Sequence, residues 1–179
     1  DVHELPKIKT GVKITHDELD GKPTNDADFI VPDSREGWVY LLRKVLDSFF
    51  ETGNGFTYST ILVRGAGELI RGFGGSASGP TILIDGINKI CKVFQSREGK
   101  KLRSIDVLDI CNIIGSVVVA GNVRRSAEIA IGDPDDYLFL RAKRWDLGGV
   151  PNYRAMSNNT IYCDDYDHTS DALWEGYSG

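Results

Sequence analysis

Two segments of the sequence combine arginine with glycine or small polar residues, a composition suited to binding phosphate. The first, RGAGELIRGFGGSASGP, runs from Arg64 to Pro80 and contains Arg71. Glycine lets the backbone come close to a ligand, and free amides beside arginine side chains can hold an anion. The loop leads into a helix predicted to start at Pro80, and a helix N-terminus favours phosphate. A surface loop that binds nothing could have the same composition, so the residues alone leave both interpretations open.

The second segment is GNVRRSAE, in which Arg124 and Arg125 lie between a predicted helix and a predicted strand. The planar guanidinium group of arginine binds phosphate and stacks on a base. Cations near a helix C-terminus can instead merely complement the helix dipole. Both interpretations are compatible with these residues.

Two common nucleotide-binding motifs do not match the first segment. Gly65-Ala66-Gly67 follows a predicted strand, but the dinucleotide-binding fingerprint needs a third glycine where Ile70 stands. No Gly-Lys-Ser/Thr follows the glycines, so the phosphate-binding loop of nucleotide triphosphatases is also excluded.

Other residues with reactive side chains have simpler explanations than catalysis. The carboxylates of GDPDD lack the spaced oxygen ligands of a cation loop, and we expect Asp133 to cap a short helix. Cys163 and His168 stand near aspartates, but no further metal ligand is evident, which favours a solvated acidic turn. His3 and His16 have no identifiable Ser or Cys partner, so no nucleophilic triad is predicted.

Composition limits the function further. The chain has 179 residues, a formal net charge of −5 and a pI near 5.2, which disfavours a surface that coats nucleic acid. Cys91 and Cys111 lie in apolar helical patterns and are expected in the core, and the cysteine usage suggests a reducing, cytoplasmic compartment. No apolar run approaches ~18 residues, so no membrane segment or signal peptide is expected. The chain starts at Asp1 and stops in a helix-like pattern, so we expect both ends to be cuts through a larger protein.

Hydrophobic periodicity predicts an α/β fold with elements in the order β-α-β-α-α-β-α-β. Asp33 is expected to cap the first helix and Ser104 the third. The predicted strands are residues 2–15, 28–31, 58–64, 127–131 and the end of RAMSNNTIY. The predicted long helices carry apolar stripes over Trp38–Phe49, Leu83–Phe94 and Val107–Val118.

Four segments in this order resemble the monomeric class II ribonucleotide reductases, which are adenosylcobalamin-dependent ribonucleoside-triphosphate reductases: DSREGWV, IRGFGGSASGP, AGNVRRSAEIAIGDPDD and RAMSNN. The resemblance covers essentially the whole chain and is densest from residue 33 to residue 160. It implies a partial slice of a ten-stranded α/β barrel with an inserted helical segment that binds an effector. Residues 1–57 would form the inserted segment, and residues 58–179 the partial barrel with two specificity loops.

The resemblance also implies the residues that bind a deoxynucleoside triphosphate (dNTP) effector. IRGFGGSASGP resembles the first specificity loop, AGNVRRSAEIA resembles the second, and Asp33 resembles the residue whose carboxylate holds the effector ribose. The implied effector-binding residues are Asp33, Arg64, Arg71, Gly74, Gly75, Ser76, Ser78 and Gly79. The residues implied to link the effector to the ribonucleotide substrate are Asn122, Arg124, Arg125 and Ser126.

The family's chemistry uses adenosylcobalamin and a cysteine thiyl radical on a loop with an Asn-x-Cys-x-Glu motif, and no cysteine of this chain has that setting. We therefore expect an inactive segment of a larger reductase, without catalytic residues or metal ligands of its own. Its expected partners are the dNTP, the ribonucleotide substrate and the rest of the reductase chain, with no nucleic acid and no membrane. The alternative is a non-catalytic interaction module that pairs with a separately encoded catalytic subunit.

Overall fold

The computed structural model describes residues 4–70, 75–120 and 126–162. The strands are β1 (Ile14–His16), β2 (Glu18–Leu19), β3 (Lys22–Pro23), β4 (Phe29–Ile30), β5 (Phe56–Ser59), β6 (Glu128–Gly132) and β7 (Ser157–Ile161). The α-helices are α1 (Arg35–Asp47), α2 (Thr81–Gln95), α3 (Ser104–Val119) and α4 (Tyr137–Leu140). A π-helical turn, η2 (Ser48–Thr52), extends α1, and two 3-10 turns, η3 (Trp145–Leu147) and η4 (Asn152–Met156), precede β7.

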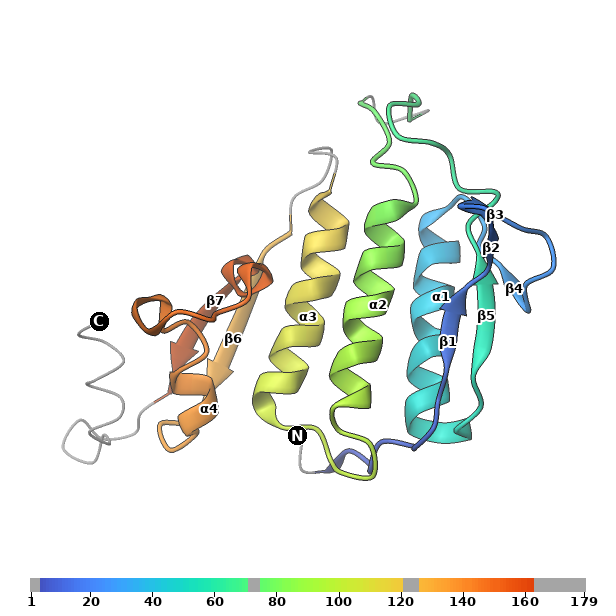
Figure 1. Cartoon of the computed structure of the whole chain (residues 1–179). Coiled ribbons are helices and arrows are strands. Elements are labelled where there is room, and N and C mark those ends of the chain that lie inside the picture. Colours follow the sequence, from blue (N-terminus) through green and yellow to red (C-terminus); the bar gives the residue numbers. More distant parts are fainter. Residues whose placement is uncertain (1–3, 71–74, 121–125, 163–179) are drawn as a thin grey trace.

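The three long helices lie side by side, with one sheet next to α1 and a second pair of strands beyond α3 (Figure 1). The first sheet has the order β1-β5-β4 and is parallel: Ile14 pairs with Phe56, and Phe29 pairs with Tyr58. β6 and β7 form a separate parallel pair, and β2 and β3 form a short antiparallel one. The fold is α/β, as the sequence predicts.

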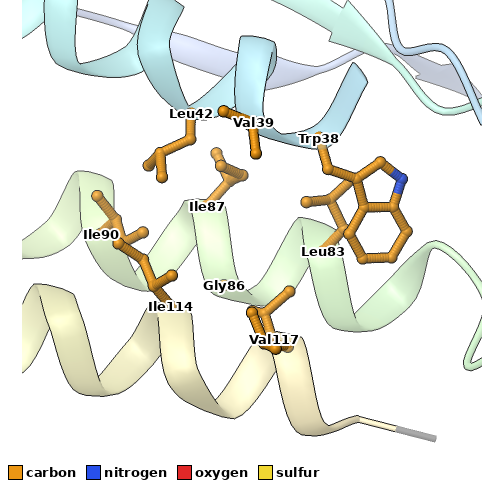
Figure 2. Close-up of a pocket in the computed structure, with 10 residues that line it drawn as sticks. Trp38, Val39, Leu42, Leu83, Gly86, Ile87, Ile90, Ile114 and Val117 are labelled. Atoms are coloured by element: carbon orange, nitrogen blue, oxygen red, sulfur yellow. The ribbon is translucent and has the colours of Figure 1, made fainter. Parts of the chain in front are cut away.

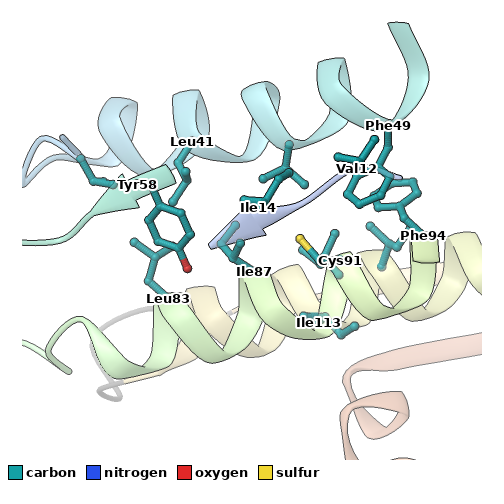
Figure 3. Packing of buried hydrophobic residues seen from close by; sticks show 14 of the residues in the cluster. Val12, Ile14, Leu41, Phe49, Tyr58, Leu83, Ile87, Cys91, Phe94 and Ile113 are labelled. Carbon is teal, nitrogen blue, oxygen red and sulfur yellow. The ribbon is translucent and has the colours of Figure 1, made fainter. Parts of the chain in front are cut away.

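One hydrophobic cluster joins the first sheet to the helices (Figure 3). Phe49 stacks on Phe94 with ring centroids 4.7 Å apart, and Tyr58 of the central strand is fully buried. The apolar stripes predicted for α1 and α2 supply much of this cluster, with the buried residues Leu41, Val45, Phe49, Leu83, Ile87, Ile90 and Phe94. Burial of these stripes is the main force that holds the helices against the sheet.

Two of the predicted strands are shorter than the sequence suggests. The run YSTILVR was expected to be a strand throughout, but β5 ends at Ser59 and the chain turns, with the amide of Val63 donating to the carbonyl of Thr60 at 2.9 Å. Its neighbour β4 ends at Ile30, so the later residues of the run have no strand to pair with. In the predicted strand 2–15, only the end belongs to β1.

The helices α3 and α4 begin at other caps than expected. The N-cap of α3 is Arg103, whose amide donates to the carboxylate of Asp106 at 2.8 Å, and Ser104 is the first helical residue. α4 is capped by Asp136, which accepts from a first-turn amide at 3.1 Å, and not by Asp133. In each helix an aspartate side chain makes the capping bond with a backbone amide at the start of the helix, because a capping side chain reaches only the amides nearest to it.

Candidate functional site

The described parts of the glycine-rich loop, residues 65–70 and 75–79, pair with each other in an antiparallel arrangement, which we call the 65–79 hairpin. The amide of Gly67 donates to the carbonyl of Ala77 at 2.9 Å, and the amide of Ile70 donates to the carbonyl of Gly75 at 3.0 Å. These bonds use up part of the backbone polar groups that an open loop would offer to a ligand. Hydrogen bonds within the backbone therefore hold the described part of the hairpin together.

The base of the 65–79 hairpin is tightly closed. The amide of Gly65 donates to the carboxylate of Glu68 at 2.8 Å. Gly79 has a φ of +79° and lies so close to Ala66 that an added Cβ would be 3.0 Å from its amide nitrogen. Only glycine satisfies both conditions, so Gly79 fixes how the hairpin enters α2.

Arg64 connects the 65–79 hairpin to the start of α1. Its Nε donates to Oδ2 of Asp33 at 2.6 Å, and its Nη1 donates to the carbonyl of Leu69 at 3.2 Å. Both Asp33 and Arg64 were predicted at an effector site, and the structure brings these two residues together across 31 positions of sequence.

Asp33 is free to make this ion pair because it does not cap α1, contrary to expectation. The cap is Ser34, whose Oγ accepts from the amide of Gly37 at 3.0 Å. The helix begins one residue later than the capping pattern suggested, which leaves the Asp33 carboxylate outside the first turn.

The other predicted effector residues divide into two groups. Gly75 and Ser76 are exposed on the described part of the hairpin, Ser78 is half-buried and Gly79 is buried. Arg71 and Gly74 lie outside the described residues. In the second predicted loop, Asn122, Arg124 and Arg125 also lie outside the described residues, and Ser126 is exposed near Gly115 of α3.

The start of α2 adds a feature that suits an anion. Its N-cap is Pro80, which has no side chain able to accept from the first-turn amides. The unsatisfied amides of a helix start and the positive end of its dipole attract phosphate. In Figure 1 the start of α1, the start of α2 and the end of α3 lie at the same end of the helical layer.

A buried ion pair that the sequence did not reveal ties α3 to η4. Arg154 donates from Nε and Nη2 to the two carboxylate oxygens of Asp109, at 2.6 and 2.8 Å, and from Nη1 to the carbonyl of Ala142 at 3.0 Å. The hydrogen bonds with Asp109 raise the pKa of Arg154. This pair fixes the chain that leads into β7 against α3.

His16 also has partners that the sequence did not reveal. Its Nδ1 lies 3.2 Å from a carboxylate oxygen of Glu18, and its Nε2 lies 2.9 Å from the hydroxyl of Thr60. Thr60 is only 1% exposed, so a substrate could not reach its hydroxyl. The arrangement joins the end of β1 to the turn after β5.

The described cysteines are poor nucleophiles. Cys91 is buried, as expected, and burial raises the pKa of its thiol to about 12. Cys111 is exposed, whereas the sequence predicted that it lies in the core. Partial burial and then the charge of Glu128 raise the pKa of its thiol. Within residues 4–70, 75–120 and 126–162, no group of His, Cys, Asp and Glu could hold a metal ion. Nor does that part of the chain contain a helix long and apolar enough to cross a bilayer.

An apolar groove, which we call the helix groove, opens between α1, α2 and α3 (Figure 2). It has a volume of about 110 Å³ and is lined by Trp38, Val39, Leu42, Leu83, Gly86, Ile87, Ile90, Ile114, Val117 and Val118. Val39 and Val118 at its rim are 66% and 42% exposed. Its size and lining do not suit a charged nucleotide, for which pockets are larger and carry polar groups.

Comparison with known proteins gives a consistent result. Residues 7–94 match the family model described as B12-dependent ribonucleotide reductase, insertion domain. The adenosylcobalamin-dependent ribonucleoside-triphosphate reductase of Lactobacillus acidophilus is 40% identical over 162 residues, covering 86% of this chain and 22% of that protein. The protein of Dictyostelium discoideum described as a probable reductase of the same kind is 40% identical over 139 residues, covering 76% of this chain and 18% of its own length.

A solved structure is also similar. The crystal structure of a B12-dependent (class II) ribonucleotide reductase matches with a TM-score of 0.73 and 28% identity, covering 91% of this chain and 25% of that chain. The shared fold and the sequence matches place the chain among the ribonucleotide reductases. Within that class it belongs to the B12-dependent family, and it spans about a fifth of the length of the curated relatives it matches.

Proposed function

We propose that this chain is the effector-binding segment of a B12-dependent ribonucleotide reductase, and that a dNTP bound to it selects which ribonucleotide the parent enzyme reduces. The relatives are named as adenosylcobalamin-dependent ribonucleoside-triphosphate reductases, so the proposed reaction of the parent is reduction of ribonucleoside triphosphates. In this proposal residues 1–57 are the inserted segment and residues 58–179 part of the barrel. β5 spans the boundary between them.

The observation that carries the proposal is the connection between Asp33, Arg64 and the 65–79 hairpin, next to the starts of α1 and α2. Amides of the hairpin and of the first turn of α2 are suited to the phosphates, together with Arg71. The carboxylate of Asp33 is suited to a ribose hydroxyl. Arg124 and Arg125 follow α3, whose end lies at the same end of the layer (Figure 1), and would pass the effect of binding to the substrate.

The described residues do not fit the cofactor. A corrinoid needs a large enclosed cavity with polar partners, whereas the helix groove has a volume of about 110 Å³ and an apolar lining. A larger hollow of about 490 Å³ is lined by residues of α1 alone, so it does not enclose a ligand: Arg35, Glu36, Val39, Tyr40 and Arg43. We therefore assign adenosylcobalamin, which would supply the radical for the reaction, to other parts of the parent protein.

Calorimetric titration of the chain with dATP, dGTP, dCTP and dTTP tests the proposal. We expect saturable binding of at least one dNTP, weakened about tenfold or more by Arg71→Ala, since a charge-assisted hydrogen bond to phosphate is lost. Lys89→Ala, an exposed cation on α2, is the matched control and should leave the affinity unchanged. A folded chain that binds none of the four nucleotides would refute the proposal.

The helix groove favours a second candidate function, an interaction module for a separately encoded catalytic subunit. Its exposed rim residues Val39 and Val118 are the kind of apolar surface that partners cover. The two candidates differ in one outcome: Val39→Asp should abolish binding to such a subunit while dNTP titrations stay unchanged.

A further inference from the structure

A positively charged surface lies at the end of the helical layer opposite the starts of α1 and α2 (Figure 1). It is formed by two segments, KIKTGVK (residues 7–13) and REGKKLR (residues 97–103). The amide of Ile8 donates to the carbonyl of Lys100 at 2.9 Å, and the amide of Gly99 donates to the carbonyl of Ile8 at 2.8 Å, so the segments lie side by side. Together they contain seven lysine and arginine residues and one carboxylate, although the whole chain has a net charge of −5. This surface therefore carries the opposite charge to the chain as a whole.

The arginines and the carboxylate of this surface are already engaged. Arg97 and Arg103 contact the buried carboxylate of Asp106 at 3.3 and 2.7 Å. The Glu98 carboxylate accepts from the amide of Gly11 at 3.2 Å. Four lysines are exposed, and we call them the lysine surface: Lys7, Lys9, Lys13 and Lys100. Among the described residues, no carboxylate forms an ion pair with any of these four ammonium groups, so they are free to attract an anion.

The backbone beneath the lysine surface is held in place. Ile8 and Val12 lie between the lysines in sequence, and each is only 1% exposed in the core. Arg97 donates from Nε and Nη2 to the carbonyl of Lys101 at 3.1 and 2.8 Å, which closes the turn that contains Lys100. A partner that binds here would order only the lysine side chains and not the backbone, which lowers the entropic cost of binding.

The composition of the two segments indicates which kind of anion they suit. Neither segment contains an aromatic residue on which a base could stack, and single-stranded nucleic acid is usually bound by such stacking. The ammonium groups are point charges spread over two segments, so they match a series of carboxylates along a chain better than one compact phosphate group. Lysine is depleted at the centres of protein interfaces, but exposed charges speed the encounter with a transient partner.

We propose that the lysine surface is a docking site for an extended segment, rich in Asp and Glu, of a separate protein that binds transiently. This site is distinct from the proposed effector site, because the two lie at opposite ends of the helical layer (Figure 1). It does not depend on whether a dNTP binds to the chain.

Fluorescence anisotropy with a labelled oligoglutamate peptide, long enough to span the lysine surface, tests the proposal. We expect saturable binding to the wild-type chain that weakens as salt is added, since exposed charges are screened. The triple variant Lys7→Gln/Lys9→Gln/Lys100→Gln should bind about tenfold more weakly, because each exposed ion pair contributes only a small part of the affinity. Circular dichroism confirms that the variant is folded.

The matched control is Lys22→Gln/Arg35→Gln/Lys89→Gln, which removes three exposed cations outside the two segments. It changes the net charge by the same amount and should keep the affinity of the wild type. An equal loss in both triple variants would overturn the proposal, because only the net charge of the chain would then matter. No binding of the peptide to the wild type would overturn it as well.

Two further measurements separate the other occupants. Tighter binding of a thymidine oligonucleotide of the same length, lost in the first triple variant, would assign the surface to nucleic acid and overturn the proposal. In the intact parent reductase, an amine-reactive label read by mass spectrometry should modify Lys7, Lys9 and Lys100 as fast as in this chain. Protection of these lysines in the parent would mean that its own chain covers them, which would overturn docking of a separate protein.

Discussion

At the scale of single residues, the buried carboxylate of Asp106 links stability to pH. It is 4% exposed, and Arg103 and Arg97 contact it at 2.7 and 3.3 Å. Burial acts to raise its pKa, but the hydrogen bonds from Arg103 and the charges of both arginines outweigh it, so the pKa lies below the ordinary 3.8. The ionised carboxylate of Asp106 stabilises the fold fully when the pH is above the ordinary pKa of 3.8. This stabilisation is lost as the pH falls through the lower pKa of the folded state.

We expect Asp106→Asn to lower the free energy of unfolding at pH 7 by about 3 kcal/mol, because it leaves two arginines beside a neutral side chain. The difference from the wild type should shrink as the pH falls below the folded-state pKa of Asp106. Urea unfolding of both proteins over a series from about pH 2.5 to about pH 6 measures this. A difference that does not depend on pH would show that Asp106 does not titrate as inferred.

The residues of the proposed site could be predicted from the sequence, but the contacts between them could not. Arg64 and the glycines were singled out because their chemistry is local, and Asp33 was singled out by the resemblance to the reductases. Their pairing, like those of Arg154 with Asp109 and His16 with Thr60, joins positions 31, 45 and 44 residues apart. Such contacts depend on how whole elements pack, and no local pattern in the sequence records that.

At the scale of elements, α2 and α3 approach each other closely at Gly86. A Cβ added there would lie 2.4 Å from a methyl group of Val117, which is closer than any real contact. Alanine is normally the better helix former, so Gly86→Ala would stabilise an isolated helix by about 1 kcal/mol. In this chain we expect it to destabilise the fold by about 1–3 kcal/mol, because overpacking outweighs the propensity.

The double variant Gly86→Ala/Val117→Ala separates the two effects. Removal of the Val117 methyl groups makes room, so in that background Gly86→Ala should become neutral or stabilising. Asn88→Ala, at an exposed position of the same helix, is the control for propensity alone. Urea unfolding gives the free energies of the wild type, Gly86→Ala, Val117→Ala, the double variant and the control. Equal losses from Gly86→Ala in both backgrounds would argue against the steric explanation.

Helices were predictable because a period of 3.6 residues marks them along the chain, and the stripes of α1 and α2 are buried as expected. The strands were less predictable than the helices. The run after Tyr58 has the composition of a strand, yet pairing stops at Ser59 because β4 is only two residues long. The length of a strand depends on the strand that it pairs with, and composition does not identify that partner strand.

At the scale of the whole molecule, two hydrophobic clusters of unequal size hold together the part of the chain that the structure describes. The larger joins the first sheet to all three long helices, and the smaller contains Ile105, Leu108, Phe139 and Ala142 under β6 and β7. The other face of β6 is open, with Ile129 and Ile131 72% and 70% exposed. Local stability should therefore decrease from the large cluster toward the β6–β7 pair.

Hydrogen exchange followed by mass spectrometry tests this gradient. We expect the amides of β6 and β7 to exchange at least about tenfold faster than those in the middle of α2, since fewer apolar contacts hold the pair closed. Asp109→Asn, which weakens the tie between α3 and η4, should increase exchange in β7 more than in α2. Uniform protection along the chain would mean that it opens only as one unit.

The order of strands in the first sheet has a consequence for synthesis. β5 is the central strand, yet it is the last of the three to be made, so β1 and β4 have no partner until Phe56–Ser59 has left the ribosome. α1 can form earlier, because its hydrogen bonds join residues that are close in sequence. Until β5 is made, however, there is no complete sheet against which the apolar stripe of α1 can pack. Since chains fold as they emerge from the ribosome, the edges of β1 and β4 stay unpaired until β5 has been synthesised. A chaperone that binds the chain during this interval would protect these edges from aggregation.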